Sequence, residues 1–406
     1  MQTYPLSSFP LVKKEIYKRV IEKIIFYGFE VRFTDTAKQA THLNKLQRLG
    51  LLNITKYYRT VSTEALQVLA GVPPIILTLR NLMKIFRLRT LGEDIQIGNR
   101  NLRAEDLEVN NSILAPWEKL KFGWRYLQPQ EGGYCIFTDG SKKDGRVGCA
   151  MVIFNEGRQI LQQNWRLNDE ASVFMAELHD IKMAISHIRD LSLKKAKIIT
   201  DSRSVLQALN NPSNTNPSVL GLKELLRYTP SVEFIWTRAH IGVAGNESAD
   251  FQAKLGTERP IIDFSYSMPL SLLKSLLLTE NLGTWQQLWS TSLKGRDVFQ
   301  LCPMVNLRRI HGNFFINQGI TGSWNIAKHQ TRFFGANPDC SCGTANEDRE
   351  HIIFHCPQWA EIRKEFFPRN FVRLSLLGIL SNERARTGVE AIMKKKLETI
   401  FETIQA

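Results

Sequence analysis

Four acidic residues stand at positions from which their carboxylates could share one site. Asp139 and Asp201 each follow an apolar run that predicts a strand, and Glu177 and Asp250 lie near the starts of predicted helices. Carboxylates gathered in this way repel one another unless cations offset their charge, and hard oxygen ligands of this kind select Mg²⁺ or Mn²⁺. Two such ions about 4 Å apart would activate a water and stabilise a leaving oxygen. The pattern predicts metal-dependent phosphodiester hydrolysis.

Each of these residues also has an ordinary structural explanation when it is taken alone. Asp139 precedes Gly140, as turn residues often do, and Asp201 could cap the helix that follows it. Glu177 and Asp250 could be solvated positions on helix surfaces. Their joint placement in one series of strands and helices favours a shared metal site over four separate explanations.

The segments that would position these residues alternate between strand and helix patterns. Runs rich in β-branched and aromatic residues, separated by turn signals, predict strands at 134–138, with Asp139 at its end, and at 147–154, 159–166, 197–200 and 232–237. The predicted helices cover 172–189, 202–209, 219–227 and 246–255, where Asn246 is a good N-cap. The order βββαβαβα indicates an α/β fold with a mixed sheet and helices packed on it.

The residues around the four acids resemble the type 1 ribonuclease H family. The resemblance rests on 136–141 (Ile-Phe-Thr-Asp-Gly-Ser), 176–178 (Ala-Glu-Leu), 199–202 (Ile-Thr-Asp-Ser), 235–242 and 245–250. It implies a ribonuclease H-like mixed five-stranded sheet with flanking helices over residues 131–260, between mainly helical regions. It also implies that Asp139, Glu177, Asp201 and Asp250 bind two Mg²⁺ ions, for which Mn²⁺ can substitute. The implied reaction cleaves the RNA strand of an RNA–DNA hybrid and leaves a 3′-hydroxyl and a 5′-phosphate.

The resemblance extends to residues outside the acidic set. His240 matches a mobile loop histidine of the family that aids proton or product handling, and a loop histidine with no role is the alternative. Backbone groups at Gly140 and Ser141 could reach the 2′-hydroxyl that distinguishes RNA from DNA. Ser172 matches a residue that holds a DNA phosphate, although helix capping alone would explain it. Asn246 completes the implied substrate contacts.

The basic residues are distributed unevenly along the chain. The 53 Lys and Arg exceed the 39 Asp and Glu, which gives a net charge of +14 and predicts an anionic partner such as nucleic acid. Residues 1–130 hold 20 basic and 11 acidic residues, 131–260 hold 16 and 15, and 261–406 hold 17 and 13. The segment 210–218 has no Lys or Arg, whereas some family members carry a basic protrusion there. We therefore expect the flanking regions to provide most of the attraction for phosphates. Removal of residues 1–130 should weaken hybrid binding.

Residues 1–130 predict a helical region followed by a linker. Apolar residues recur at helical spacing from 11 to 89, and 92–130 has the composition of a linker. The segments 58–66 (Tyr-Arg-Thr-Val-Ser-Thr-Glu-Ala-Leu) and 69–74 resemble the region after the reverse transcriptase domain in non-LTR retrotransposon (LINE-like) polyproteins; an unrelated basic helical domain is the alternative. No aromatic-x-Asp-Asp motif occurs, so the interpretation is a polyprotein fragment without polymerase activity.

Four residues in the C-terminal region, 261–406, have the spacing of a zinc site. Cys340 and Cys342 are followed by His351 and Cys356 within 338–357, which predicts a tetrahedral Cys-Cys-His-Cys knuckle. His355 is a competing ligand, and free thiols in a helical region are the alternative. Polyproteins of the family named above often end in such a knuckle, which implies a structural Zn²⁺ and contact with nucleic acid.

Other function classes are excluded or kept as alternatives. No stretch approaches the roughly 18 apolar residues of a membrane span, and residues 1–10 lack the basic and then apolar pattern of a signal peptide, so we expect an intracellular protein of the nucleus or cytoplasm with no membrane partner. A catalytically idle nucleic-acid-binding remnant of a retroelement polyprotein is the main alternative. An integrase or transposase with a similar sheet is disfavoured by Trp-Thr-Arg-Ala-His at 236–240. The oligomeric state is left open.

Overall fold

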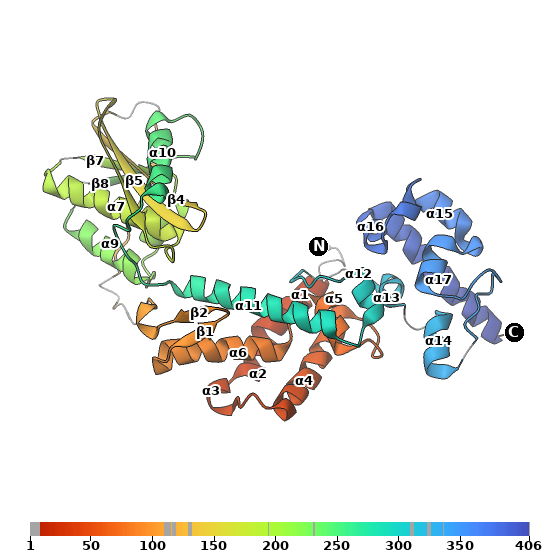
Figure 1. Cartoon of the computed structure of the whole chain (residues 1–406). Helices are drawn as coiled ribbons and strands as arrows, with labels where there is room; N and C mark the ends of the chain where they lie inside the picture. Colours follow the sequence, from red (N-terminus) through yellow and green to blue (C-terminus); the bar gives the residue numbers. More distant parts are fainter. Residues whose placement is uncertain are drawn as a thin grey trace. The chain divides into compact units, whose positions relative to one another are not determined.

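The chain forms two compact units, which are described separately. The computed structural model describes residues 9–108, 115, 119–128, 132–193, 195–229, 232–308, 312–322, 326–335 and 337–405. Unit 2 is one continuous stretch, Arg87–Leu276, whereas unit 1 combines Met1–Phe86 with Leu277–Ala406. In Figure 1 the red and orange helices and the teal to blue helices are the two parts of unit 1, whereas the orange strands β1 and β2 and the yellow and green elements belong to unit 2.

Unit 2 is built on a mixed sheet. Its strands are β3 (Arg125–Tyr126), β4 (Tyr134–Lys143), β5 (Arg146–Asn155), β6 (Arg158–Leu167), β7 (Ala196–Thr200) and β8 (Val232–Trp236). They lie in the order β3-β8-β7-β4-β5-β6. The three long strands β4, β5 and β6 pair antiparallel, while β7 is parallel to both β4 and β8. The expected mixed α/β sheet is confirmed, and it carries a sixth strand, β3, beside β8.

Helices cover both faces of this sheet. On one face, α7 (Val173–Asp190), α8 (Arg203–Asn210) and α9 (Pro217–Arg227) enclose a core that includes Ile136, Ile198 and Phe234. On the other face, α10 (Ala244–Glu258) places Ala249 against Phe137. Figure 1 shows α7 and α10 on either side of the strands. Because neighbouring residues of a strand point to opposite faces, β4 contributes side chains to both cores.

The stretch that the sequence predicted as a linker contains ordered structure. β1 (Ile95–Ile97) and β2 (Arg100–Leu102) form an antiparallel hairpin, and the helical turn η4 (Ala104–Asp106) follows it. β3 then pairs in parallel with β8 through Tyr126 and Trp236. Part of the aromatic segment 117–126 lies outside the described residues. The linker prediction was wrong for the hairpin and β3, which are too short to give a clear strand pattern in the sequence.

Unit 1 is helical and has one core shared by its two chain segments. Its helices and helical turns are α1 (Phe9–Ile16), η2 (Tyr17–Ile21), α2 (Glu22–Phe26), α3 (Phe29–Arg32), α4 (Ala37–Thr55), α5 (Thr63–Ala70), α6 (Ile75–Phe86), α12 (Arg296–Leu301), α13 (Phe314–Thr321), α14 (Ala327–Phe334), η6 (His351–His355), η7 (Pro357–Trp359), α15 (Ala360–Phe366), η8 (Phe371–Arg373), α16 (Leu376–Ser381) and α17 (Glu383–Gln405). The turn η3 (Arg87–Leu91) belongs to unit 2. Helix α11 (Leu270–Thr291) is divided: residues 270–276 belong to unit 2 and residues 277–291 to unit 1. Leu51 and Leu66 from the N-terminal segment share the core with Trp285, Trp289 and Ile392.

Among the described residues, no single helix has both the length and the apolar character to cross a bilayer. The bent pair Thr63–Ala70 and Ile75–Leu91 meets these two requirements only when its members are taken together.

Candidate active site and candidate metal centre

The first carboxylate of the candidate active site lies within a strand. Asp139 is the sixth residue of β4, which continues to Lys143, so the prediction that the strand ends at Asp139 was wrong. The strand continues because β5 pairs with it throughout, including Asp139 with Ala150. The parallel pairing with β7 does end here, at Thr138 and Thr200. Asp139 therefore lies just past the point where β4 and β7 separate, and its side chain is 7% exposed.

The second carboxylate comes from α7, which approaches β4 closely. The Ser172 hydroxyl caps this helix by accepting a hydrogen bond from Met175 N at 3.2 Å, as its sequence position predicted. A Cβ atom at Gly140 would lie 2.9 Å from Ala176 Cβ and 2.9 Å from Glu177 N, so only glycine fits between strand and helix. This close approach brings Glu177 next to Asp139, and Glu177 is buried.

The third carboxylate, Asp201, directly follows β7 and is held by two neighbours. Trp236 Nε1 donates a hydrogen bond to the Asp201 carbonyl oxygen at 3.1 Å, and Asn246 Nδ2 donates to Asp201 Oδ2 at 3.2 Å. Asn246 is buried within α10, which begins at Ala244 with Val243 at its N-cap, so the prediction that Asn246 caps this helix was wrong. Its amide holds a carboxylate in place instead.

Three carboxylates meet at the edge of the sheet. One oxygen each of Asp139, Glu177 and Asp201 lies within 4.8 Å of the others. Burial, followed by the nearby Asp201 and Asp250 charges, raises the pKa of Asp139 to about 8. Burial and then the Asp139 and Asp201 charges raise the pKa of Glu177 well above its usual value. A bound cation would relieve this repulsion, and three carboxylates are the oxygen donors that Mg²⁺ and Mn²⁺ prefer.

The fourth predicted acid adjoins the cluster and has a cation beside it. Asp250 lies on α10, close enough to Asp139 to raise its pKa. Lys254, one turn later, forms an ion pair with Asp250 at 2.7 Å. Asp250 also groups with the exposed His240 and Glu247, whose ligand atoms lie within 4.8 Å of one another. His240 sits in the loop between β8 and α10 with a φ of 54°. Its exposure and its nearness to Asp250 place it at the rim of the acidic cluster.

A fifth acidic residue, which the sequence did not single out, lies behind the cluster. Asp180 is fully buried in α7, one turn after Glu177. Burial, followed by the neighbouring Glu177 and Asp139 charges, raises the pKa of Asp180 well above its usual value. The only sequence signal was its position three residues after Glu177, on the face of the helix that packs on the sheet.

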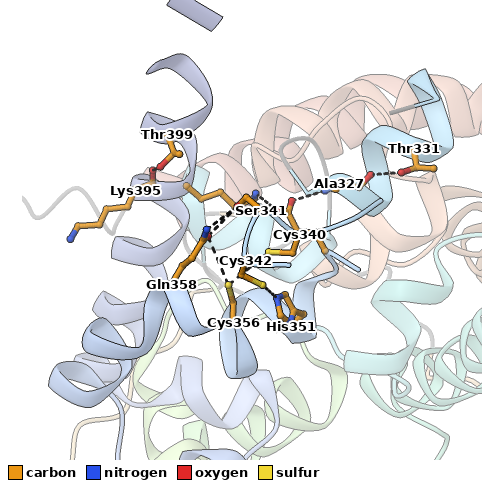
Figure 2. A network of polar contacts seen from close by, with 12 residues as sticks. Ala327, Thr331, Cys340, Ser341, Cys342, His351, Cys356, Gln358, Lys395 and Thr399 are labelled. Atoms are coloured by element: carbon orange, nitrogen blue, oxygen red, sulfur yellow. Dashed lines mark hydrogen bonds and ion pairs between the residues drawn. The ribbon is translucent and has the colours of Figure 1, made fainter. Parts of the chain in front are cut away.

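A second candidate metal centre lies in unit 1. Figure 2 shows Cys340, Cys342, His351 and Cys356 with their sulfur and nitrogen atoms turned toward one another. All four ligand atoms lie within 4.8 Å of one another. Cys340 Sγ and Cys356 Sγ are 3.8 Å apart, and Cys342 Sγ is 3.2 Å from His351 Nε2. His355 is exposed and outside this group, so the geometry favours His351 over the competing ligand.

These distances suit a tetrahedral ion. Zn–S bonds of about 2.3 Å place two sulfurs of a regular tetrahedron about 3.8 Å apart, which matches the Cys340 and Cys356 pair. Hydrogen bonds from the Thr344 hydroxyl and backbone lower the pKa of Cys342 to about 6, which favours the thiolate that binds metals. The His351 backbone N–H donates to Asp348 Oδ1 at 2.9 Å and fixes the start of η6.

Comparisons with known proteins agree with this fold. The model of the RNase H family matches residues 131–258. A Pol polyprotein of a type-1 retrotransposable element R1 from Bradysia coprophila is 33% identical over 101 residues, 23% of this chain and 10% of the relative. A Pol polyprotein of equine infectious anemia virus (strain Wyoming) is 30% identical over 141 residues, 33% of this chain and 12% of the relative. The chain thus spans about a tenth of the length of these two relatives.

A solved structure is similar to part of the chain. The RNase H1 of Halobacterium salinarum NRC-1 is 20% identical, with a TM-score of 0.27, and the match covers 31% of this chain and 98% of that one.

Proposed function

Residues 131–258 of this chain are a ribonuclease H domain, and we propose that this domain cleaves the RNA strand of RNA–DNA hybrids with two Mg²⁺ ions. The observation that carries the proposal is the meeting of Asp139, Glu177 and Asp201 within 4.8 Å inside the matched region. Asp250 beside Asp139 supplies the fourth acid. The relatives are retroelement and retroviral Pol polyproteins, so we propose a retrotransposon polyprotein as the setting of the reaction.

The four acids are the proposed metal ligands. Asp139 adjoins the other three carboxylates, and together with Glu177, Asp201 and Asp250 it would hold the ions. When bound, the two ions would activate a water and stabilise the leaving oxygen of the ribose. Carboxylate oxygens also accept Mn²⁺, so Mn²⁺ should substitute for Mg²⁺.

The remaining site residues would hold the acids and the substrate. Asn246 keeps Asp201 in one orientation through its 3.2 Å hydrogen bond. The backbone of Gly140 and Ser141, next to Asp139, would contact the 2′-hydroxyl of the RNA strand. The Ser172 hydroxyl accepts a hydrogen bond from its own helix and keeps its proton free to donate to a DNA phosphate. His240, exposed at the rim, would handle a proton or the departing product.

We also propose a structural Zn²⁺ at Cys340, Cys342, His351 and Cys356. The four ligands come from a short loop and from η6, two segments that the ion would join. Gln358, whose Oε1 lies 4.0 Å from Cys356 Sγ, and Ser341, which hydrogen-bonds to Gln358, would support the ligands from outside (Figure 2). Structural sites with four protein ligands contribute to folding rather than to catalysis.

The test is a cleavage assay with the full chain. A hybrid labelled on its RNA strand should be cut when Mg²⁺ is present, leaving a 3′-hydroxyl and a 5′-phosphate. The same hybrid labelled on its DNA strand, a double-stranded DNA and a single-stranded RNA should stay intact. Hybrid binding without any Mg²⁺-dependent or Mn²⁺-dependent product would instead support an idle nucleic-acid-binding remnant.

A further inference from the structure

Two adjoining cavities lie in unit 1, away from every residue proposed above for hybrid cleavage. Their volumes are about 780 and 620 Å³. Arg48, Thr63, Glu64 and Lys294 line both of them, so the two cavities are parts of one hollow, which we call the α4 cleft. All of its lining residues belong to unit 1.

One wall of the cleft is a polar face of helix α4. The side chains that line it are those of Thr41, Asn44, Lys45 and Arg48, which are separated by three, one and three positions. Residues at this spacing lie along one side of a helix. Another face of α4 is apolar and packs into the core through Leu43, Leu51 and Ile54. The helix therefore presents the polar side chains of Asn44, Lys45 and Arg48 to the cleft.

The basic side chains of the cleft are of two kinds. Arg48 is fixed, because it donates a hydrogen bond to Thr63 Oγ1 at 3.1 Å and another to the Arg59 carbonyl oxygen. Lys45, Lys294 and Lys328 are exposed, and within the described part of the chain their ammonium groups form no ion pair. Three lysines are thus available to a ligand beside a guanidinium that is already positioned.

The cleft also carries hydroxyl groups and acids. Ser62 and Thr63 lie at the start of α5, where the partial positive charge of the helix adds to that of the lysines. Six basic side chains line the two cavities against four acidic ones. Of the acids, Asp348 accepts a hydrogen bond from the His351 backbone N–H. The balance therefore favours an anion with several charges.

We propose that the α4 cleft binds the sugar–phosphate backbone of a single nucleic-acid strand. Cavities of this size accept groups as large as nucleotides, whereas a double helix is too wide to enter them. The tryptophans that line the cleft, Trp285 and Trp289, are almost wholly buried and offer no free ring face for a base. Lysines and hydroxyls contact phosphates and carry no sequence information, so binding should be independent of sequence.

The test compares two full-length variants that lose the same charge from the same unit. The first carries Lys45→Gln, Lys294→Gln and Lys328→Gln in the cleft. The control carries Lys38→Gln, Lys364→Gln and Lys394→Gln, three exposed lysines of unit 1 that do not line either cavity. Fluorescence anisotropy with a labelled single-stranded RNA 20-mer, without Mg²⁺, would give Kd over a range of salt concentrations.

The expected difference is large enough to measure. For a single strand, loss of three phosphate contacts reduces the slope of the logarithm of the binding constant against the logarithm of the salt concentration by about 2 in magnitude. Between 50 and 200 mM salt, binding by the unaltered chain should therefore weaken roughly 20-fold more than binding by the cleft variant. The control variant should keep the steeper salt dependence of the unaltered chain. Equal slopes for the two variants would overturn the proposal.

Two further readouts keep this test separate from the nuclease proposal. Thermal unfolding should give the same Tm for both variants, and the single substitution Lys294→Glu should weaken binding on its own if the triple variant unfolds. Hybrid cleavage at saturating substrate should proceed at the same rate in both variants, because none of the six lysines belongs to the acidic cluster. A chain that cuts no hybrid but binds RNA through the cleft would contradict the nuclease proposal and leave the cleft proposal intact.

Point substitutions test the cleft better than removal of residues 1–130 does. Residues 1–86 share a core with residues 277–406, so their removal would disrupt unit 1.

Discussion

Asn246 Nδ2 donates a hydrogen bond to Asp201 Oδ2 at 3.2 Å, across the gap between α10 and the end of β7. Asn246 is only 3% exposed, and its Oδ1 has no hydrogen-bond partner among the described residues. A buried amide with one free oxygen is costly unless its position serves another purpose. Here the Asn246 amide holds the Asp201 carboxylate, at the end of β7, in one orientation.

Asn246→Ala should lower the rate of hybrid cleavage by about 10- to 100-fold, because partners that orient metal ligands contribute on this scale. The loss should be partly recovered at high Mg²⁺, since a freely rotating Asp201 still binds a cation but less tightly. Initial rates over a Mg²⁺ titration would measure both effects. An unchanged rate and an unchanged Mg²⁺ midpoint would show that Asp201 needs no support from α10.

Gly140→Ala should damage both stability and activity. The new Cβ would meet Ala176 and Glu177 at 2.9 Å, so α7 must move away from β4 and take Glu177 with it. Overpacking of this kind costs about 1–3 kcal/mol of unfolding free energy. Urea denaturation and cleavage rates would show the two effects together.

Gly221→Ala is the matched control for this prediction. Gly221 lies inside α9, and apart from its chain neighbours and the backbone of its own helix no heavy atom lies within 4 Å of an added Cβ. Alanine should stabilise the helix by about 0.5–1 kcal/mol and leave cleavage unchanged. If both glycine substitutions had the same effect, the close approach at Gly140 would not be what positions Glu177.

Much of the candidate site could be predicted from the sequence. The four acids, the strands around them and the capping of α7 by Ser172 all leave local patterns, because strand and helix periodicity and N-cap residues are local properties. The partner of Asn246 and the burial of Asp180 leave none. Both depend on which elements meet in space: α10 packs against β4, and α7 covers the sheet.

The composition of unit 1 could not be predicted for the same reason. Its two segments, separated by the whole of unit 2, have helical periodicity that shows which faces are apolar but not what covers them. Leu51 and Trp289 share a core although 238 positions separate them. Likewise β3 has two residues, and only its pairing with β8 makes it a strand.

The buried Asp139 should make metal binding depend on pH. Its pKa of about 8 means that protons compete with Mg²⁺ for the carboxylate. The Mg²⁺ concentration that gives half the maximal cleavage rate should therefore fall as the pH rises from 6 to 8. Cleavage rates over Mg²⁺ titrations at several pH values would measure this, and the same midpoint throughout would contradict it.

The same carboxyl gives a stability prediction for the metal-free chain. Its folded pKa is raised above the unfolded value of 3.8, so the folded state binds more protons and loses stability as the pH rises from about 4 through 8. Mg²⁺ should reduce this loss, because it replaces the proton. Thermal unfolding of unit 2 with and without Mg²⁺ would test the sign.

The cysteine cluster should hold about one Zn²⁺ per chain. Cys356→Ser should abolish zinc retention. It should also lower the Tm of unit 1, because the ion would no longer join the two segments that supply the four ligands. Cys302→Ala, which removes a buried thiol of unit 1 outside the cluster, is the control and should keep the zinc. Metal analysis by mass spectrometry, together with thermal unfolding after chelation, would measure both. Equal zinc content in the two variants would rule out the assigned ligands.

We propose that the acids meeting at the edge of the sheet carry out hydrolysis of the RNA strand. Asp139→Asn and Asp201→Asn keep the shape of each side chain and remove the charge that would bind the cations. Asp144→Asn is the control, because Asp144 is exposed in the turn between β4 and β5 with a φ of 50°, a conformation that asparagine tolerates. In a Mg²⁺-dependent assay on a labelled RNA–DNA hybrid, we expect full cleavage by the control and none by the other two variants. Equal cleavage by all three would contradict it.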